Sequence, residues 1–143
     1  MSGWLVVRSA ERTLALPVGI VEELVAVPAP LPAPGVLAAV RGVAPFRGRL
    51  VPLVHLGAAI GRGPPPPALG TTGVAVVLHG RRVLLEVDEA TELTTAEAEP
   101  LPHGWRGRWA SSAVRQSGTL VPILDPAWLA ERLTGGGAGS ATA

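Results

Sequence analysis

The sequence contains no cysteine, lysine, asparagine or tyrosine among its 143 residues. Without cysteine there is no disulfide framework, thiolate metal site or cysteine nucleophile. Without lysine there is no phosphate-binding loop of the Walker type, because that loop contacts the phosphates through a lysine. Alanine, glycine, proline and arginine are abundant instead. We interpret this bias as the base composition of a GC-rich bacterial genome and not as a functional signal.

Aromatic and charged residues are also scarce. Aromatic residues make up 3% of the chain and charged residues 16%, and the formal net charge is +1. A charge so close to zero does not favour a nucleic-acid-binding protein, which usually carries a strong basic field. The hydrophobic share of 48% is mostly Val, Leu and Ala. A chain of this length and composition is expected to fold as one domain around an aliphatic core.

Long apolar runs are absent as well. The longest runs have the length of strands and are broken by proline, glycine or charge, far short of the roughly 20 residues that cross a bilayer. The N-terminal segment MSGWLVVRSAERT lacks the basic start and apolar stretch of a secretory signal. We therefore predict a cytoplasmic protein without direct membrane insertion.

The pattern along the chain predicts an all-β fold. Aliphatic and β-branched runs of strand length alternate with polar or glycine-containing turns, at 4–8, 13–18, 20–27, 49–56, 74–80, 81–93 and 119–125. Pro52 lies inside one run and predicts an edge strand or a bulge there.

Helices and loops fill the remaining chain. Helical turns are expected over 36–42 and after Leu56, and a helix over 126–133, capped by Asp125. Residues 134–143 are predicted to be a flexible tail. The proline-rich stretches 28–35 and 62–73, the latter stiffened by PPPP, are expected to be semi-rigid loops.

The two halves of the chain resemble each other. Residues 15–24 align with 84–93, and residues 48–54 align with 118–124, at nearly equal offsets. This similarity predicts a duplicated β unit with halves near 1–61 and 73–133. Because each half is too small to bury enough surface alone, we expect one domain over 1–133 in which two barrel-like units share a core.

The sequence shows no assembled catalytic or metal-binding motif. His55, His79 and His103 pair with no other ligand at metal-binding spacing, and no GxSxG motif is present. His55 is expected to be half-buried in a strand and His79 solvated at a turn. The acidic residues alternate with apolar ones, which is typical of a solvated strand face. We predict no catalytic residue, metal or cofactor, and a scaffold that binds other proteins.

Two other functions remain open from the residues. A small hydrolase would need a serine paired with a histidine base, and Ser111, Ser112 or Ser117 with His103 or His79 could supply it. The segment WRGRW at 105–109 could stack on nucleic-acid bases. A tryptophan in the core or at a protein interface explains this segment better, so we expect no nucleic-acid partner.

The segment RGVAPFRGRLVPLVHL at 41–56 resembles the signature of CheW-like domains, the adaptors of bacterial chemotaxis. That signature runs roughly G-h-x-N-L-R-G-x-h-x-P-h-x-D-L, where h is valine or isoleucine. The residues that fit it are Gly42, Val43, Arg47, Gly48, Leu50, Pro52, Leu53 and Leu56. The resemblance continues through ALPVGIVEEL, GRRVLLEVDEATEL, TTAEAEPLP and GTLVPILDPAWL, and so covers nearly the whole chain.

The resemblance implies a fold, partners and a binding region. The family fold is two intertwined five-stranded β-barrels with short helices and a C-terminal helix. The implied partners are the regulatory domain of a CheA-type histidine kinase and the cytoplasmic tip of a methyl-accepting chemoreceptor, with recruitment to membrane-associated receptor arrays. The positions that match the partner-binding region are Val21, Glu23, Phe46, Arg47 and Gly48. Arg47 suits either receptor contact or a structural role in shaping its loop.

Several positions depart from the family pattern. Pro45 and Phe46 stand where the signature has Asn-Leu, His55 replaces its aspartate, and in the second half Leu84 and Glu86 replace a glycine and an apolar residue. These changes keep an alternative open, in which the module is retuned to a different partner in motility or polarity control. For the core we expect Val51, Leu53, Val76, Val87, Leu120 and Ile123.

Overall fold

The computed structural model describes residues 3–33, 37–102 and 109–142. Within these residues the chain forms strands, one 3₁₀ turn and two helices. In chain order these are β1 (Trp4–Ser9), β2 (Arg12–Pro17), η1 (Val18–Ile20), β3 (Val21–Ala26), β4 (Val40–Phe46), β5 (Arg49–His55), α1 (Leu56–Ala59), β6 (Thr72–Leu78), β7 (Arg81–Val87), β8 (Glu89–Thr94), β9 (Ala98–Pro100), β10 (Ser112–Gln116), β11 (Thr119–Ile123) and α2 (Pro126–Thr142).

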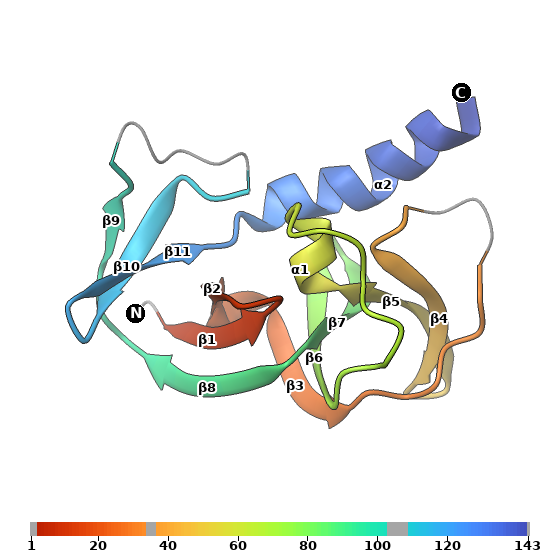
Figure 1. The fold of residues 1–143 in the computed structure, drawn as a ribbon, viewed down its shortest axis with the longest axis horizontal. Coiled ribbons are helices and arrows are strands. Elements are labelled where there is room, and N and C mark those ends of the chain that lie inside the picture. Colours follow the sequence, from red (N-terminus) through yellow and green to blue (C-terminus); the bar gives the residue numbers. More distant parts are fainter. Residues whose placement is uncertain (1–2, 34–36, 103–108, 143) are drawn as a thin grey trace.

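The strands form two sheets that lie side by side in Figure 1, with α2 starting between them and running above the second sheet. The first sheet has the order β8-β1-β2-β11-β10-β9, and the second has the order β3-β6-β7-β5-β4. Neighbouring strands are antiparallel except for β2 with β11 and β5 with β7, which are parallel. The predicted all-β fold is confirmed, with six strands in the first sheet where five were expected.

Four hairpins have two-residue turns in which both residues adopt positive φ. The turns are Ala10-Glu11, Arg47-Gly48, His79-Gly80 and Ser117-Gly118. Positive φ at both positions is typical of type I′ turns, whose twist matches that of the flanking strands. Glycine at the second position of three turns adopts this φ without a steric penalty. The Arg-Gly pair of the signature is therefore the turn between β4 and β5.

The second sheet curls, and the chain that follows β3 reaches its far edge at β4. Leu31, after β3, forms an isolated antiparallel bridge with Val43 of β4, with N–H···O distances of 2.7 and 2.9 Å. The curled sheet encloses a small apolar cluster of Ala44, Phe46, Val51, Leu53, Ala75 and Leu84. A corresponding cluster in the first sheet contains Val6, Ala15, Val114, Val121 and Ile123. Each sheet thus forms a barrel-like unit, and a larger core packs between the two units.

Strands from both halves of the chain build each sheet. Strand β3 leaves the first hairpin and pairs with β6, while β8 crosses in the opposite direction and pairs with β1. The pairings correspond, since Leu24 lies opposite Val74 and Leu93 lies opposite Leu5. The two units are therefore intertwined. This correspondence agrees with a duplicated unit, although the duplication itself stays a prediction.

Most of the expected core residues are buried. Val51, Leu53, Val76, Val87 and Ile123 are all in the core. Leu120 is only partly buried and packs against the edge of the central core.

Two local predictions need correction. The helical turn expected over 36–42 is wrong, because β4 begins at Val40 and pairing with β5 overrides the local helical preference. Pro52 is neither on an edge strand nor in a bulge, since β5 lies between β7 and β4 and Pro52 pairs with Val43 in regular register. The backbone N–H and C=O of Val43 both bond to Leu31. Val43 therefore needs no hydrogen bond from Pro52, which has no N–H to donate.

The C-terminal helix is longer than predicted. Helix α2 begins at Pro126, as expected, and continues to Thr142 instead of ending at 133. Asp125 caps it, because its carboxylate accepts hydrogen bonds from the N–H groups of Ala127 and Trp128 at 3.0 and 3.4 Å. The flexibility of residues 134–143 stays a prediction.

Candidate partner-binding surface

A network of opposite charges joins the β4–β5 turn to strands β3 and β7. The Arg47 guanidinium pairs with the Glu23 carboxylate and lies 4.0 Å from Glu22. Arg82 donates to both oxygens of Glu22, at 2.8 and 3.2 Å, and this hydrogen bonding lowers the pKa of the Glu22 carboxyl. The structure thus brings together Glu23 and Arg47, two of the residues that the resemblance implied. Because these pairs are exposed, they contribute little stability and can exchange for a partner's charges.

The other three implied residues have different environments. Phe46 is only 8% exposed and points into the barrel of the second sheet, where its ring centroid lies 5.3 Å from the Arg47 guanidinium carbon. Val21 is half-buried and packs against the central core. Gly48 lies at the open turn beside Arg47. Phe46 therefore supports Arg47 from inside, whereas Glu23, Arg47 and Gly48 form the accessible part of the group.

An apolar patch that the sequence analysis missed covers the outer face of β4 and β5. Leu31, Val43 and Pro52 lie opposite one another, and Pro45 lies opposite Leu50 in the next outward-facing row. Leu50 is 61% exposed and Leu31 59% exposed. The alternate residues of the same strands fill the barrel, so both faces of this hairpin are apolar. We call Leu31, Val43, Pro45, Leu50 and Pro52 the apolar patch; exposed surfaces of this kind commonly mark protein-binding sites.

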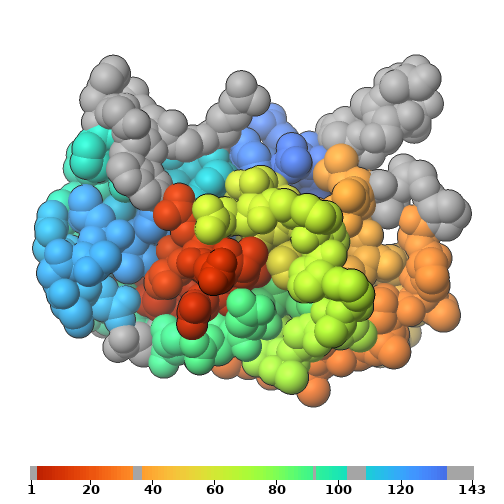
Figure 2. Space-filling view, in the orientation of Figure 1, coloured from red at the N-terminus to blue at the C-terminus, as the bar shows by residue number. Residues whose placement is uncertain are grey.

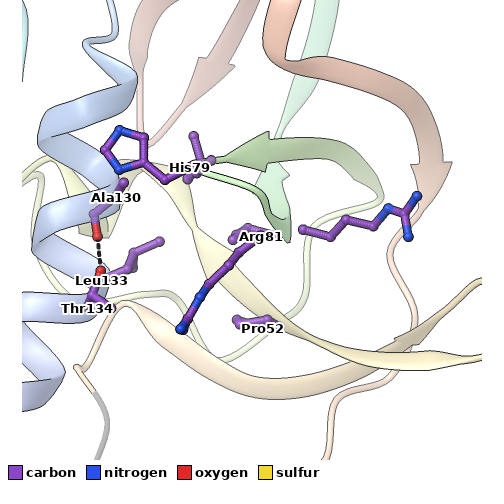
Figure 3. A pocket seen from close by; sticks show the side chains of 9 residues that line it. Pro52, His79, Arg81, Ala130, Leu133 and Thr134 are labelled. Atoms are coloured by element: carbon purple, nitrogen blue, oxygen red, sulfur yellow. Dashed lines mark hydrogen bonds between the residues drawn. The ribbon is translucent and has the colours of Figure 1, made fainter.

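A groove of about 430 Å³ adjoins the apolar patch at Pro52. It lies between the β6–β7 turn and α2, with His79 beside the helix and Arg81 between His79 and Pro52 (Figure 3). Its apolar lining comes from both sheet and helix, while arginines lie along its rim. The lining residues are Pro52, Leu78, His79, Arg81, Arg82, Val83, Ala130, Leu133 and Thr134.

His55 is buried and caps a helix, contrary to the expectation of a half-buried side chain. It is 3% exposed, and its Nδ1 accepts a hydrogen bond from the N–H of Ala58 at 3.0 Å. In the same helix α1, Gly57 N–H donates to Ser9 Oγ of β1 at 2.9 Å. His55 thus performs the capping role that an aspartate can perform, and the helix it caps links the two sheets.

We expect acid to destabilise the protein through His55. Burial lowers the pKa of its imidazole below the ordinary value of 6.5; Glu86 and Asp88 oppose this shift and Arg41 reinforces it. His55 therefore binds a proton at a higher pH in the unfolded chain than in the native one. Its contribution to the free energy of unfolding is fully present above pH 6.5 and decreases as the pH falls below that value. Protonated Nδ1 can no longer accept the capping bond, a loss of about 0.5–2 kcal/mol.

Urea denaturation at a series of pH values would measure this effect. His55→Asn keeps a neutral capping acceptor. It should flatten the plot of unfolding free energy against pH between pH 6.5 and the lower native pKa of His55. His79→Asn, at an exposed turn, is the matched control and should leave the profile unchanged. An unchanged profile in His55→Asn would assign the acid sensitivity to other groups.

Glu86 forms a buried ion pair, so the expectation of a solvated strand face is wrong at this position. The Arg41 guanidinium donates to both Glu86 oxygens, at 2.5 and 3.0 Å. The Glu86 side chain is 2% exposed. Glu86 also accepts from the N–H of Gly70 at 2.6 Å, while Arg41 donates to the carbonyl of Ala68 at 3.1 Å. The pair therefore holds the loop before β6 against the second sheet.

The structure does not bring the candidate pair Ser117 and His79 together. Ser117 lies on the β10–β11 turn of the first sheet, whereas His79 lies on the β6–β7 turn of the second. In the part of the chain that the structure describes, no group of three His, Asp or Glu side chains could hold a metal ion. No helix among these residues is long and apolar enough to cross a membrane. His103 and most of WRGRW, at 105–108, lie outside the described residues.

The intertwined β units thus carry an apolar patch beside a network of exposed charges on the second sheet. The model of the CheW-like domain matches residues 3–133. The chain therefore belongs to the CheW-like domain family, whose members are non-catalytic scaffolds and adaptors of chemotaxis signalling.

The fold is similar to that of a solved scaffold. The crystal structure of the scaffolding protein TtCheW from Thermoanaerobacter tengcongensis superimposes with a TM-score of 0.79. The two chains share 20% sequence identity, and the match covers 90% of this chain and 91% of TtCheW. Among curated proteins, none matches the sequence.

Proposed function

We propose that this protein couples the cytoplasmic tips of chemoreceptors to a CheA-type histidine kinase by binding both, without catalysing a reaction. The observation that carries the proposal is the apolar patch beside the network of Arg47, Glu22, Glu23 and Arg82 on the second sheet. Protein interfaces commonly combine an apolar centre with a polar rim that fixes orientation. The surface provides both, on the β4–β5 hairpin and the strands beside it.

The groove beside the patch suits a helical partner. An amphipathic helix can place apolar side chains into a groove of this kind, and acidic residues of such a helix would meet Arg81 and Arg82 at the rim. The patch and the groove share Pro52, so two partners could bind side by side on the second sheet. This adjacency is what an adaptor between a receptor and a kinase requires.

Isothermal titration calorimetry tests the proposal. The purified protein would be titrated with the regulatory domain of each CheA-type kinase of the same organism, and separately with each receptor tip fragment. Micromolar binding to both classes supports coupling. Binding to the kinase alone, or to neither, contradicts it and directs the search to other partners.

Arg47→Ala should weaken partner binding by about tenfold, because arginine is frequently an interface anchor. The folded state should lose no more than about 1 kcal/mol, since its ion pairs are exposed. Arg115→Ala removes a comparable exposed pair, with Glu99 at 3.1 Å on the first sheet, and is the control. Calorimetry and thermal melting of both variants measure the two effects. Unchanged binding by folded Arg47→Ala would show that Arg47 only shapes the turn.

Leu50→Asp should weaken binding more strongly, by about a hundredfold, because it puts a charge within the apolar patch. Leu50 is exposed, so folding should be little affected. Leu93→Asp changes a similarly exposed leucine on β8 of the first sheet and should leave binding unchanged. Equal losses of affinity in the two variants would remove the apolar patch from the interface.

A second candidate function, binding of a different partner in motility or polarity control, is favoured by Pro45. This residue replaces the asparagine of the family signature and is exposed in the apolar patch. It therefore changes the docking surface itself, whereas His55 preserves a capping role. Pro45→Asn should increase affinity for the kinase and receptor fragments if this substitution has retuned the surface. Unchanged affinity would argue against retuning at this position.

A further inference from the structure

The segment between α1 and β6 displays a run of prolines on the surface. It reads Arg62-Gly63-Pro64-Pro65-Pro66-Pro67, and we call it the proline segment. All of its residues are exposed except Pro65, which is half-buried. Figure 2 shows the chain that contains it, between α1 and β6, crossing the face turned to the viewer. The coupling function proposed above makes no use of this segment.

The proline segment is held firmly at both ends. At its start, the N–H of Arg62 donates to the carbonyl of Gly57 at 2.9 Å, and the Arg62 Nε donates to the carbonyl of Ala10 at 3.4 Å. Just after its end, Arg41 and Glu86 hold Ala68 and Gly70 through the bonds described above. A buried ion pair adds little net stability compared with apolar residues of the same size. Its effect here is to fix where the proline segment ends.

The proline segment is better suited to binding another protein than to pairing with a strand of this protein. Proline has no N–H and fixes φ near −65°, so four in a row cannot join a sheet ladder and favour the polyproline II conformation. Among the described residues, no protein donor bonds to the carbonyls of Pro64 to Pro67. Pro64 and Pro65 also line a hollow of about 460 Å³ with small residues such as Ala38, Ala58 and Gly63. A partner's aromatic rings could pack on the prolines while its donors reach the free carbonyls.

We propose that the proline segment is a ligand for a second protein, a domain whose aromatic-lined groove takes polyproline II segments. The order Arg-x-Pro-x-x-Pro places prolines at 64 and 67 for the two aromatic slots that such grooves use for a PxxP ligand. Arg62 stands at one end, where a carboxylate of the partner can pair with it. Because the segment is already ordered at both ends, binding loses less conformational entropy than binding of a free peptide.

Titrations with isolated domains test this assignment. The full chain would be added to a ¹⁵N-labelled SH3 domain and, separately, to a ¹⁵N-labelled WW domain, each with known PxxP ligands. We expect shifts confined to the aromatic groove of at least one domain and micromolar affinity. Pro64→Ala/Pro67→Ala should reduce the affinity about tenfold or more, as expected for interface anchors, and Arg62→Ala should reduce it further when combined.

The control is Pro32→Ala, an exposed proline in the other proline-rich loop, which should bind like the unchanged protein. Circular dichroism and thermal melting would establish that each variant is folded. No groove-specific shift with either domain overturns the proposal, as does equal binding by folded Pro64→Ala/Pro67→Ala. Neither result bears on coupling of receptor and kinase, because that is measured with different fragments and a different surface.

Discussion

Replacing Arg41 by methionine is expected to lower the free energy of unfolding by about 3–5 kcal/mol, the usual cost of leaving one charge of a buried pair unpaired. Arg41 is the only ion-pair partner of Glu86 within the described residues, and the Glu86 carboxylate lies inside the second sheet. After the substitution, the N–H of Gly70 would still donate to it, but no positive charge would remain. Urea denaturation at pH 7 would measure the loss.

The decisive control is the double variant Arg41→Met/Glu86→Leu. It removes both charges and puts an apolar residue at 86, the type that the family pattern has there. Replacing a buried ion pair by apolar residues is often neutral or stabilising, so the double variant should recover most of the stability. If Arg41→Met alone costs less than about 1 kcal/mol, the pair is not buried in solution and behaves like a surface pair.

Gly42→Ala is expected to be the most damaging glycine substitution. Gly42 has φ +144°, and a Cβ there would lie 2.0 Å from the carbonyl oxygen of Leu31. The chain would have to move away and give up the two hydrogen bonds between Leu31 and Val43. Strained backbone costs about 1–3 kcal/mol, and each lost bond costs about 0.5–1.5 kcal/mol more. The sum is about 2–6 kcal/mol, and the edge of the apolar patch would open.

Gly48→Ala is the control that measures the cost of a positive φ without a steric clash. Gly48 also has positive φ, at +76°, but nothing lies within 4 Å of a Cβ added there. It should therefore lose only about 1 kcal/mol. Denaturation curves give both stabilities, and hydrogen exchange at Val43 reports the bridge. Equal, small losses in the two variants, with Val43 still protected, would contradict the close approach of Leu31 and Gly42.

The sequence by itself determined the local elements and the family. Strand-length aliphatic runs predicted most of the strands, because a half-buried strand requires apolar residues whatever it pairs with. They did not predict β4, β9 or β10. Asp125 and Pro126 located the start of α2, since capping acts within one turn. The order and spacing of the signature residues identified the CheW-like family before the strand pairing was known.

Only the tertiary structure decided which faces of these elements are buried. Glu86 and His55 looked like ordinary polar residues of strands, yet pairing of β5 with β7 buries both and places Arg41 against Glu86. Phe46 looked like a surface anchor, but the curl of the second sheet turns it inward. The same curl leaves Leu50 and Leu31 exposed, because both faces of the β4–β5 hairpin are apolar and the sequence cannot tell inside from outside. Those assignments depend on contacts between residues far apart in the chain, which no local pattern records.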